Sequence, residues 1–297
     1  MIDMRPVSLA LLSLILAFAG CTGKNPGIRQ SRGEYHRIIS FAPSITETLF
    51  ALGAGDRVVG VTRYCNYPPQ VKNLPKIGDY LNPNYEMILR LKPDLVLLLK
   101  QHSSLSEFLA VNRISGKVIE NENVKEILQS FTVIGEICGK TKQADSIKAS
   151  IMAELSGVCA PEHRPKILFC IGRDNPGSGR ISKVYLAGPK SFYNELMHDA
   201  GGENVYRDSL FSYPTFSSEG VIRLAPDIII DVMASVSGTS REKATNDWKE
   251  LAVVPAVVNG LVFCPAGDYL SIPGPRLGLV FNDIRKAVQK FQQQHRK

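Results

Sequence analysis

The sequence predicts an α/β fold of two parallel-sheet lobes joined by a single long connecting helix, with a ligand cleft between the lobes. Three observations predict this fold. Short apolar runs alternate with helical stretches in both halves of the 297-residue chain. Between these halves, residues 124–158 show helical periodicity and no strand pattern. A nine-residue segment also recurs, once as residues 86–94 and once as residues 219–227.

The first lobe is predicted over residues 37–140. Continuous apolar runs separated by helices are typical of a parallel sheet that is covered on both faces. The predicted strands are residues 37–41, 58–61, 95–99 and 117–119. The predicted helices are residues 44–52, which end at Gly53, and residues 85–91, which Pro93 terminates because proline cannot continue a helix.

The connecting helix is predicted over residues 141–160, after a break near Gly139. Pro161 and Pro165 follow it, and both prevent the helix from continuing. The second lobe is therefore predicted over residues 161–297.

The repeated segment indicates that the second lobe has the plan of the first. Residues 86–94 and 219–227 share Glu, Arg, Leu, Pro and Asp at identical spacing, and each is followed by an apolar strand. Two such lobes facing each other leave a cleft at the carboxyl ends of their strands, where α/β proteins usually bind ligands. The glycine-rich residues 172–179 lack the lysine and helix start of a phosphate loop, so we expect them to link two strands at the mouth of the cleft.

The N-terminus is predicted to carry an export signal and a lipid anchor. Residues 1–20 hold Arg5 and an apolar run that is too short to span a bilayer, as in a secretory signal peptide. Cys21 follows in a context that resembles a bacterial lipobox, so we expect its lipidation. Residues 21–36 are polar and contain glycine and proline, which predicts a flexible tether. These features predict an extracytoplasmic protein anchored to a membrane, either in the periplasm or on the outer face of the cell.

Composition excludes several other classes of protein. The chain is 44% hydrophobic and 21% charged, which argues against disorder and against an integral-membrane fold. Its net charge is +7, but the basic residues are spread along the chain and no recognition motif accompanies them, so we expect no nucleic-acid partner. Five cysteines remain after Cys21, and their wide spacing indicates neither a zinc site nor a disulfide framework. We expect these cysteines to be mostly buried small residues, and the sequence does not determine whether any of them form disulfides. They are Cys65, Cys138, Cys159, Cys170 and Cys264.

A series of short motifs runs along nearly the whole mature chain. They are residues 40–44 (Ser-Phe-Ala-Pro-Ser), 66–69 (Asn-Tyr-Pro-Pro), 91–96, 201–205, 224–229, 248–251 and 254–260. Together and in this order, the motifs resemble the periplasmic binding proteins for ferric siderophores, haem and vitamin B12. The resemblance implies two α/β lobes rigidly joined by one long helix. It also implies the solute-binding component of an ABC importer, which delivers its ligand to a membrane permease.

Within this family, the members that bind vitamin B12 resemble the chain most. Their pattern implies ligand-binding residues at Tyr64, Tyr80, Tyr213, Asp268 and Tyr269. Tyrosines suit a large flat chelate because each gives contact area, ring stacking and one polar tip. Asp268 could accept hydrogen bonds from ligand amides or cap the next turn. Arg63 could pair with an anionic ligand or lie solvated in its loop.

Glu86 and Glu219 stand at equivalent places in the repeated segment. A carboxylate in the first turn of a helix complements the helix dipole and needs no further role. In the family, glutamates at these positions meet arginines of a two-fold symmetric permease dimer. The resemblance therefore implies a docking role for the symmetric pair.

The expected ligand is a corrinoid, and a ferric siderophore or haem stays open as the alternative. A cleft enzyme of unknown reaction is the remote alternative, because no Gly-x-Ser-x-Gly elbow occurs in the sequence. A site for a free metal ion is not expected, since only His102 of the five histidines is placed to face the cleft. We therefore expect no enzyme activity and no cofactor, apart from the cobalt or iron that the ligand itself contains.

Overall fold

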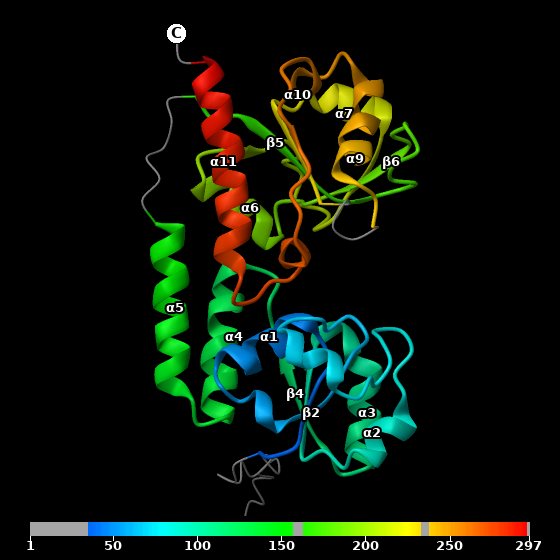
Figure 1. Cartoon of the computed structure of the whole chain (residues 1–297), viewed down its shortest axis with the longest axis vertical. Coiled ribbons are helices and arrows are strands. Elements are labelled where there is room, and N and C mark those ends of the chain that lie inside the picture. The colour runs from blue at the N-terminus through cyan, green and yellow to red at the C-terminus, as the bar shows by residue number, and fades with distance from the viewer. Residues whose placement is uncertain (1–34, 157–162, 233–237, 296–297) are drawn as a thin grey trace, which may run out of the picture. The chain divides into compact units, whose positions relative to one another are not determined.

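The computed structural model describes residues 35–156, 163–232 and 238–295, which belong to one compact unit. Two sheets form its framework, one built from the strands of residues 38–119 and the other from those of residues 166–263 (Figure 1). The predicted signal peptide, Cys21 and Cys159 lie outside the described residues. Within the described residues, no helix has the length and apolar character that crossing a membrane requires.

The first sheet is parallel and has the strand order β2-β1-β3-β4. Its strands are β1 (Ile38–Ser40), β2 (Val58–Val61), β3 (Leu95–Leu99) and β4 (Ser115–Ile119). Its helices are α1 (Pro43–Ala51), α2 (Tyr85–Arg90), α3 (Ser103–Val111) and α4 (Val124–Ile137), with the short 3₁₀ helices η1 (Gly55–Arg57), η2 (Pro69–Asn73) and η3 (Lys100–His102). Along β3, Leu95, Leu97 and Leu99 pack in one cluster with α1 and α4, and Val96 and Leu98 pack in another with α2 and α3. Helices therefore cover both faces of this sheet, as its continuous apolar strands predict.

The second sheet has the order β10-β9-β5-β6-β8, and β7 also pairs with β5. Its strands are β5 (Lys166–Arg173), β6 (Lys183–Leu186), β7 (Glu203–Asn204), β8 (Thr215–Ser217), β9 (Ile228–Asp231) and β10 (Val262–Phe263). Its helices are α6 (Phe192–Asp199), α7 (Ser218–Leu224), α9 (Arg241–Asp247), α10 (Pro255–Val258) and α11 (Leu277–His295), with η4 (Trp248–Leu251) and η5 (Asp268–Ser271). The structure thus confirms the two-lobed α/β fold. The second sheet differs from the predicted parallel sheet, because β6 is antiparallel to β5 and β8 is antiparallel to β6.

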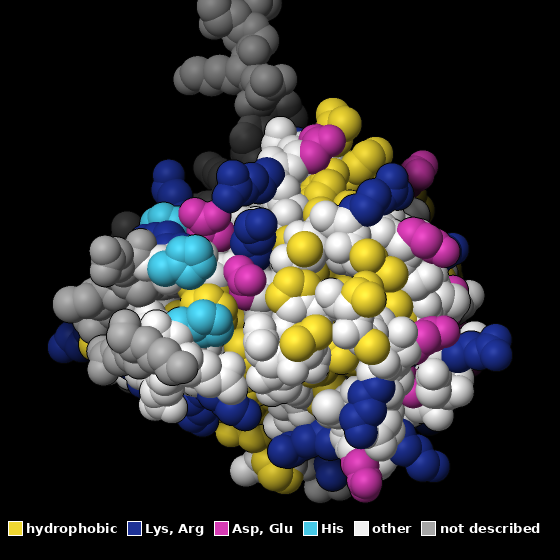
Figure 2. Space-filling model, turned by 90° about the horizontal axis from the view of Figure 1, so that it is seen from above, with side chains coloured by type: hydrophobic (Ala, Val, Ile, Leu, Met, Phe, Trp, Pro, Cys, Tyr) yellow, Lys and Arg dark blue, Asp and Glu magenta, His cyan; other side chains and the backbone are white. Residues whose placement is uncertain are grey.

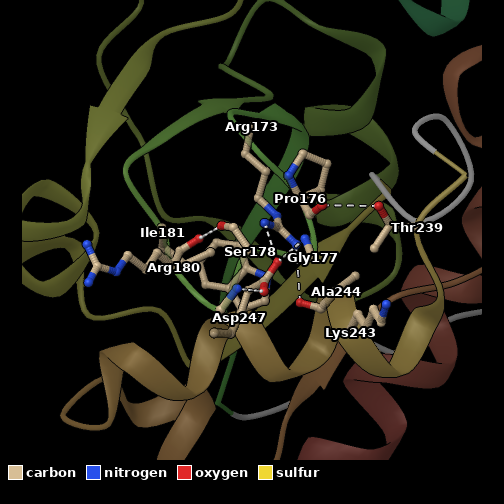
Figure 3. A network of polar contacts seen from close by, with 12 residues as sticks. Arg173, Pro176, Gly177, Ser178, Arg180, Ile181, Thr239, Lys243, Ala244 and Asp247 are labelled. Carbon is tan, nitrogen blue, oxygen red and sulfur yellow. Dashed lines mark hydrogen bonds and ion pairs between the residues drawn. The ribbon is translucent and has the colours of Figure 1, made fainter.

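The glycine-rich loop between β5 and β6 explains this difference. It joins two strands, as predicted, but it returns the chain antiparallel to β5. Buried Asp247 accepts hydrogen bonds from the amides of Gly177 and Gly179, each at 2.6 Å (Figure 3). Both glycines have positive φ, a conformation that other residues rarely adopt. Arg173 in turn forms buried ion pairs with Asp247 and Asp231, which ties the loop to the end of the sheet.

The helical stretch between the sheets folds as two helices, with the break near Gly139 that the sequence predicts. Gly139, with φ of 66°, ends α4, and α5 (Thr141–Leu155) then packs beside α4 and against α11 (Figure 1). Glycine in this conformation is the usual way to end a helix, because it carries no Cβ. The end of the predicted connecting helix, from residue 157 onward, lies outside the described residues.

The repeated segment has the same local geometry in both lobes. Lys92 and Ala225, each directly before a proline, have φ of 46°. Asp94 accepts hydrogen bonds from two backbone amides just before β1, and Asp227 accepts one from Lys166 at the start of β5. The repeated Asp therefore fixes the start of the neighbouring strand, and the repeat has a structural function in each lobe.

The cysteines of the described residues are buried, as predicted. Cys170 pairs in register with Asp231 of β9, and Cys264 follows β10 on the opposite side of β9. Two strand spacings amount to roughly 10 Å, whereas a disulfide needs Cα atoms within about 7 Å. These two thiols therefore cannot form a disulfide in this fold.

Candidate ligand-binding site

The carboxyl ends of the parallel strands position most of the predicted ligand-binding residues. Arg63 and Tyr64 follow β2, and His102 lies just after β3. In the second lobe, Asp268 and Tyr269 lie in η5, after β10. Parallel strands end at one edge of their sheet, so the loops that follow them come together there.

Four rings form a column at this edge of the first sheet. Tyr64 stacks on Tyr80 with ring centroids 5.7 Å apart, and Tyr80 stacks on His102 at 5.1 Å and an interplanar angle of 4°. Phe41 meets His102 edge-on at 5.2 Å. Tyr64, at the outer end, is 49% exposed, while Phe41 and His102 are buried. The ring of Tyr64 is therefore open to solvent, and the rings beneath it hold it in place.

His102 has a defined protonation state in this column. Its Nδ1 accepts the amide hydrogen of Leu99 at 3.0 Å, which places the remaining hydrogen of the neutral ring on Nε2. Burial also lowers the pKa of His102, which favours the neutral form. A metal ion would need the lone pair that Nε2 lacks in this tautomer. The ring is therefore suited to supporting Tyr80 and is unsuited to coordinating a metal ion.

Arg63 and the loop that carries Tyr80 are joined by Asp79. Arg63 forms an ion pair with Asp79 at 2.9 Å. The same carboxylate accepts the amides of Leu81 and Asn82, at 2.9 and 2.8 Å. These amides and the Arg63 charge lower the pKa of Asp79, most strongly through the Asn82 amide. Arg63 thus has an internal partner, although its own side chain is largely exposed.

Tyr213 comes from the segment before β8 and is 47% exposed. Burial of its inner part, and next the negative charge of Glu122 from the first lobe, raise the pKa of Tyr213. Its loop is held by the Gly188 amide, which donates to Ser212 at 2.7 Å. A Cβ at Gly188 would lie 2.4 Å from the carbonyl oxygen of Phe211, so only glycine allows this approach. The Gly188 segment therefore fixes the loop that presents Tyr213.

Asp268 and Tyr269 both contact Arg276. The guanidinium donates to Asp268 at 2.6 Å and lies 5.7 Å from the ring centroid of Tyr269. The hydroxyl of Tyr269 donates to Asp283 of α11 at 2.7 Å. Asp268 remains 50% exposed, so its carboxylate is reachable from solvent.

Arg276 also binds Glu47 of α1 in the first lobe. The Arg276 Nε donates to Glu47 at 2.8 Å, and the Nη2 donates to the second oxygen of the same carboxylate. The guanidinium lies 4.1 Å from the ring centroid of Tyr67, which follows β2. Arg276 therefore contacts both lobes at once.

Sequence reasoning did not identify Glu47 and Arg276 as parts of this arrangement, and it placed His102 at the cleft without its stacking on Tyr80. Glu47 had a detectable signal, because it is a lone carboxylate within the apolar helix α1 and is only 2% exposed. A buried carboxylate normally requires a partner. The sequence does not say that the partner is 229 positions away.

The surface has hollows of different sizes, and their volumes do not identify the ligand site. A small hollow of about 50 Å³ lies at the carboxyl ends of β3 and β4, lined by Lys100, Gln101, Ile119, Glu120, Asn121, Glu122 and Glu126. A larger one of about 460 Å³ lies beside α6 and is lined mainly by polar residues. None of the predicted ligand-binding residues lines either hollow. The smaller hollow includes Glu122, which is close enough to influence Tyr213, so we place the candidate site on that side of the molecule.

Glu86 and Glu219 occupy the same position in α2 and α7. Both are exposed in the first turn of their helix, which Asn84 caps in α2 and Ser217 caps in α7. The hydroxyl of Ser217 is the main cause that lowers the pKa of Glu219. The two carboxylates therefore reach solvent at matching sites of the repeat.

A free metal ion has no site in the described part of the chain. No three His, Cys, Asp or Glu side chains gather there in a way that could hold one. The chemistry that the site offers is ring stacking, from Tyr64 and Tyr213, and hydrogen-bond acceptance, from Asp268.

Comparison with known proteins assigns a relationship over most of the chain. The profile of a family described as periplasmic binding protein matches residues 38–264. An uncharacterized ABC transporter substrate-binding lipoprotein of Bacillus subtilis, YvrC, is 31% identical over 255 residues, which cover 82% of this chain and 77% of the relative.

Two further matches have different ligands in their names. The vitamin B12-binding protein of Pectobacterium atrosepticum is 25% identical over 253 residues, covering 84% of this chain and 86% of that protein. The structure of the haem-binding protein RhuT from Roseiflexus superposes with a TM-score of 0.72, at 24% identity, and covers 86% of this chain and 98% of that one. The names of these two proteins thus give different ligands, vitamin B12 and haem.

Proposed function

This chain belongs to the periplasmic binding protein family, and we propose that it captures a corrinoid outside the cytoplasm and delivers it to the permease of an ABC importer. The observation that carries this proposal is the stack of Tyr64 on Tyr80, supported from beneath by His102. A flat ligand with an apolar face gains contact area from an aromatic surface that is already held in place. Tyr213 offers a second exposed ring from the other lobe.

The charges around these rings favour a ligand with amide groups over a polyanion. Two arginines beside the predicted ligand-binding residues already pair with carboxylates of the protein, Arg63 with Asp79 and Arg276 with Glu47 and Asp268. The small hollow that includes Glu122 is lined by one lysine and three glutamates. Acidic ligand groups would meet like charges there, whereas the amides of a corrinoid can donate hydrogen bonds to carboxylates.

Spectroscopy of the bound ligand tests the proposal. The mature chain is mixed separately with cobinamide, haem and a ferric siderophore and is then separated from unbound ligand by gel filtration. We expect the corrinoid absorption bands to elute with the protein. Elution of haem or the siderophore in place of cobinamide would contradict the corrinoid assignment and keep the binding role. Elution of no ligand would contradict the binding role and favour the remote alternative, an enzyme.

Anchoring through lipid at Cys21 is part of the same proposal. A tether over residues 21–36 would hold the binding lobes close to the permease, and lipoprotein is the class in the name of the Bacillus relative. Metabolic labelling with a fatty acid would detect the anchor, and Cys21→Ser should abolish the label.

The proposed function includes docking on the permease through Glu86 and Glu219. The repeat gives each lobe one exposed carboxylate at an equivalent place, which matches a partner built as a two-fold symmetric dimer. Figure 2 shows the end of the molecule that carries α7 and α10, where hydrophobic side chains gather with Lys and Arg around them. Ile222, one turn after Glu219, and Val253 and Val258 near α10 are exposed. This surface can therefore combine a charged contact with apolar burial.

A further inference from the structure

Arg276 lies where the two lobes meet, between η5 and the start of α11. Its side chain is 14% exposed, and that of Glu47 is 2% exposed. Two donors of the guanidinium bind both oxygens of Glu47, and a third binds Asp268. One planar group therefore joins a helix of the first lobe to the segment of the second lobe that carries the predicted ligand residues.

The pKa values of Arg276 and Glu47 depend on the ion pair between them. Burial raises the pKa of Glu47, and Arg276 opposes this effect by hydrogen bonding and by its charge. Burial alone would lower the pKa of Arg276, but its bonds to Glu47 and Asp268 raise it above the usual value. Each charge therefore favours the ionised form of the other, although burial outweighs this effect for Glu47, and removing either partner leaves a buried charge without its counterpart.

Aromatic rings and a second carboxylate fix the direction of the guanidinium. It lies against Tyr67 of the first lobe at 4.1 Å and near Tyr269 of the second lobe at 5.7 Å. Tyr269 is in turn fixed by its hydrogen bond to Asp283 of α11. Residues of both lobes beside the candidate site thus depend on the position of one side chain.

We propose that Arg276 is the positioning residue of the ligand site, which sets the spacing of the two lobes through Glu47 and orients Asp268 toward the ligand. The guanidinium itself is engaged within the protein, so it acts through these partners and not as a ligand contact. Only the identity of the ligand in this inference rests on the proposed function. A lysine cannot replace Arg276, because a single ammonium cannot bind both oxygens of Glu47 and also Asp268 in the fork geometry of a guanidinium.

Affinity measured on folded protein separates positioning from mere stabilisation. The variants are Arg276→Lys, Glu47→Gln and the two combined, in the full mature chain. Arg285→Lys is the matched control, because Arg285 lies on α11 and donates to Asn282 of its own helix. Cobinamide binding is measured by calorimetry well below the thermal midpoint of every variant. We expect Arg276→Lys and Glu47→Gln each to raise the Kd about tenfold or more, and the combined variant to be no worse than the weaker single one.

An unchanged Kd in both single variants, with lowered thermal midpoints, would overturn the proposal, because Arg276 would then only stabilise the fold. Additive effects of the two substitutions on Kd would overturn it as well. Arg285→Lys should leave both Kd and the thermal midpoint as in the wild type.

A ligand-free measurement decides the matter if the wild type binds no corrinoid. Small-angle X-ray scattering of the unliganded chain reports the spacing of the lobes independently of ligand identity. We expect Arg276→Lys and Glu47→Gln to increase the radius of gyration and to broaden the distance distribution, and Arg285→Lys to match the wild type. Identical scattering from all four proteins would overturn the positioning role, whereas failure of cobinamide alone concerns only the proposed function.

Discussion

Residues of the candidate site differ in how much of their side chain is exposed. Substitution of the exposed tyrosines should affect ligand binding. Tyr64 and Tyr213 each expose about half of the side chain, at 49% and 47%. We expect Tyr64→Ala and Tyr213→Ala each to weaken corrinoid binding by about 1–3 kcal/mol, because each removes aromatic area that the ligand would cover. Tyr85 is 40% exposed but packs on Phe108 beside α2, so Tyr85→Ala is the matched control. Calorimetry that finds all three substitutions equal would contradict these roles.

Asp79 gives a prediction for the pH dependence of stability. The amides of Asn82 and Leu81 and the charge of Arg63 lower its pKa. A carboxyl with a lowered pKa in the folded state stabilises the fold above its unfolded pKa of about 3.9, and this contribution is lost as the pH falls through the folded pKa. The wild type should therefore exceed Asp79→Asn in urea midpoint at pH 7, and the difference should shrink at pH 3.

An exposed aspartate provides the control for this titration. Asp145 on α5 has a side chain that is 73% exposed and only one ion pair, with Lys148. Asp145→Asn should change the midpoint little at either pH. A gap between wild type and Asp79→Asn that stays constant from pH 7 to pH 3 would show that the charge of Asp79 does not support its loop.

Residue types and motifs allowed part of the site to be predicted. The rings of Tyr64 and Tyr80 are brought together in the structure, and Asp268 remains accessible. The support of Tyr80 by His102, and the pairing of Arg276 with Glu47, could not be predicted. Both depend on which side chains the tertiary fold brings into contact, and periodicity within one segment carries no information on such contacts.

At the scale of elements, a glycine at the start of α11 leaves room for a glutamate side chain of α5. A Cβ at Gly278, in the first turn of α11, would lie 1.5 Å from the Glu154 Oε2. Glu154 therefore places its carboxylate at a helix start, which contributes about 0.3–1 kcal/mol. Alanine in a helix gains roughly 0.5–1 kcal/mol over glycine. The two effects are similar, so we expect Gly278→Ala alone to change the free energy of unfolding little.

The same comparison predicts a different result once the carboxylate is removed. In a Glu154→Ala background, Gly278→Ala meets no obstruction and should stabilise the protein by about 0.5–1 kcal/mol. Urea denaturation of the two single variants and the double variant measures this coupling. An equal effect of Gly278→Ala in both backgrounds would mean that Glu154 and Gly278 do not interact.

All four strands of the first sheet could be predicted because the sheet is buried on both faces. The run of residues 95–99 is apolar throughout, and β3 has these same bounds. The helix α3 was not predicted, since its nine residues include three serines and too short an apolar pattern. The antiparallel direction of β6 and β8 was not predicted, because it depends on a loop fixed by Asp247, far along the chain.

At the scale of the whole molecule, the two equivalent glutamates should separate transport from ligand binding. Reversing both charges, with Glu86→Arg and Glu219→Arg, would place like charges opposite the proposed arginines of the permease, which costs several kcal/mol at an interface. We expect uptake in cells to be lost and the affinity of the isolated protein for its ligand to be retained. Glu242, exposed in the first turn of α9, supplies the control substitution Glu242→Arg.

Uptake and affinity together distinguish permease docking by these glutamates from a helix-start role and from a role in the ligand site. Uptake that survives the double reversal would mean that Glu86 and Glu219 act only as helix-start residues. A joint loss of affinity and uptake would instead indicate an altered fold or a role in ligand binding. Glu242→Arg should leave both uptake and affinity unchanged, because this glutamate lies outside the repeated segment.

The affinity of the wild-type protein for a corrinoid tests the central claim most directly. The proposed cleft combines exposed tyrosines, an accessible Asp268 and arginines that are already paired, and these features suit a flat ligand with amide groups. Calorimetric titration of the mature chain with cobinamide should therefore give a submicromolar Kd and a stoichiometry of one. Weaker binding of cobinamide than of haem or a ferric siderophore under the same conditions would contradict the corrinoid assignment.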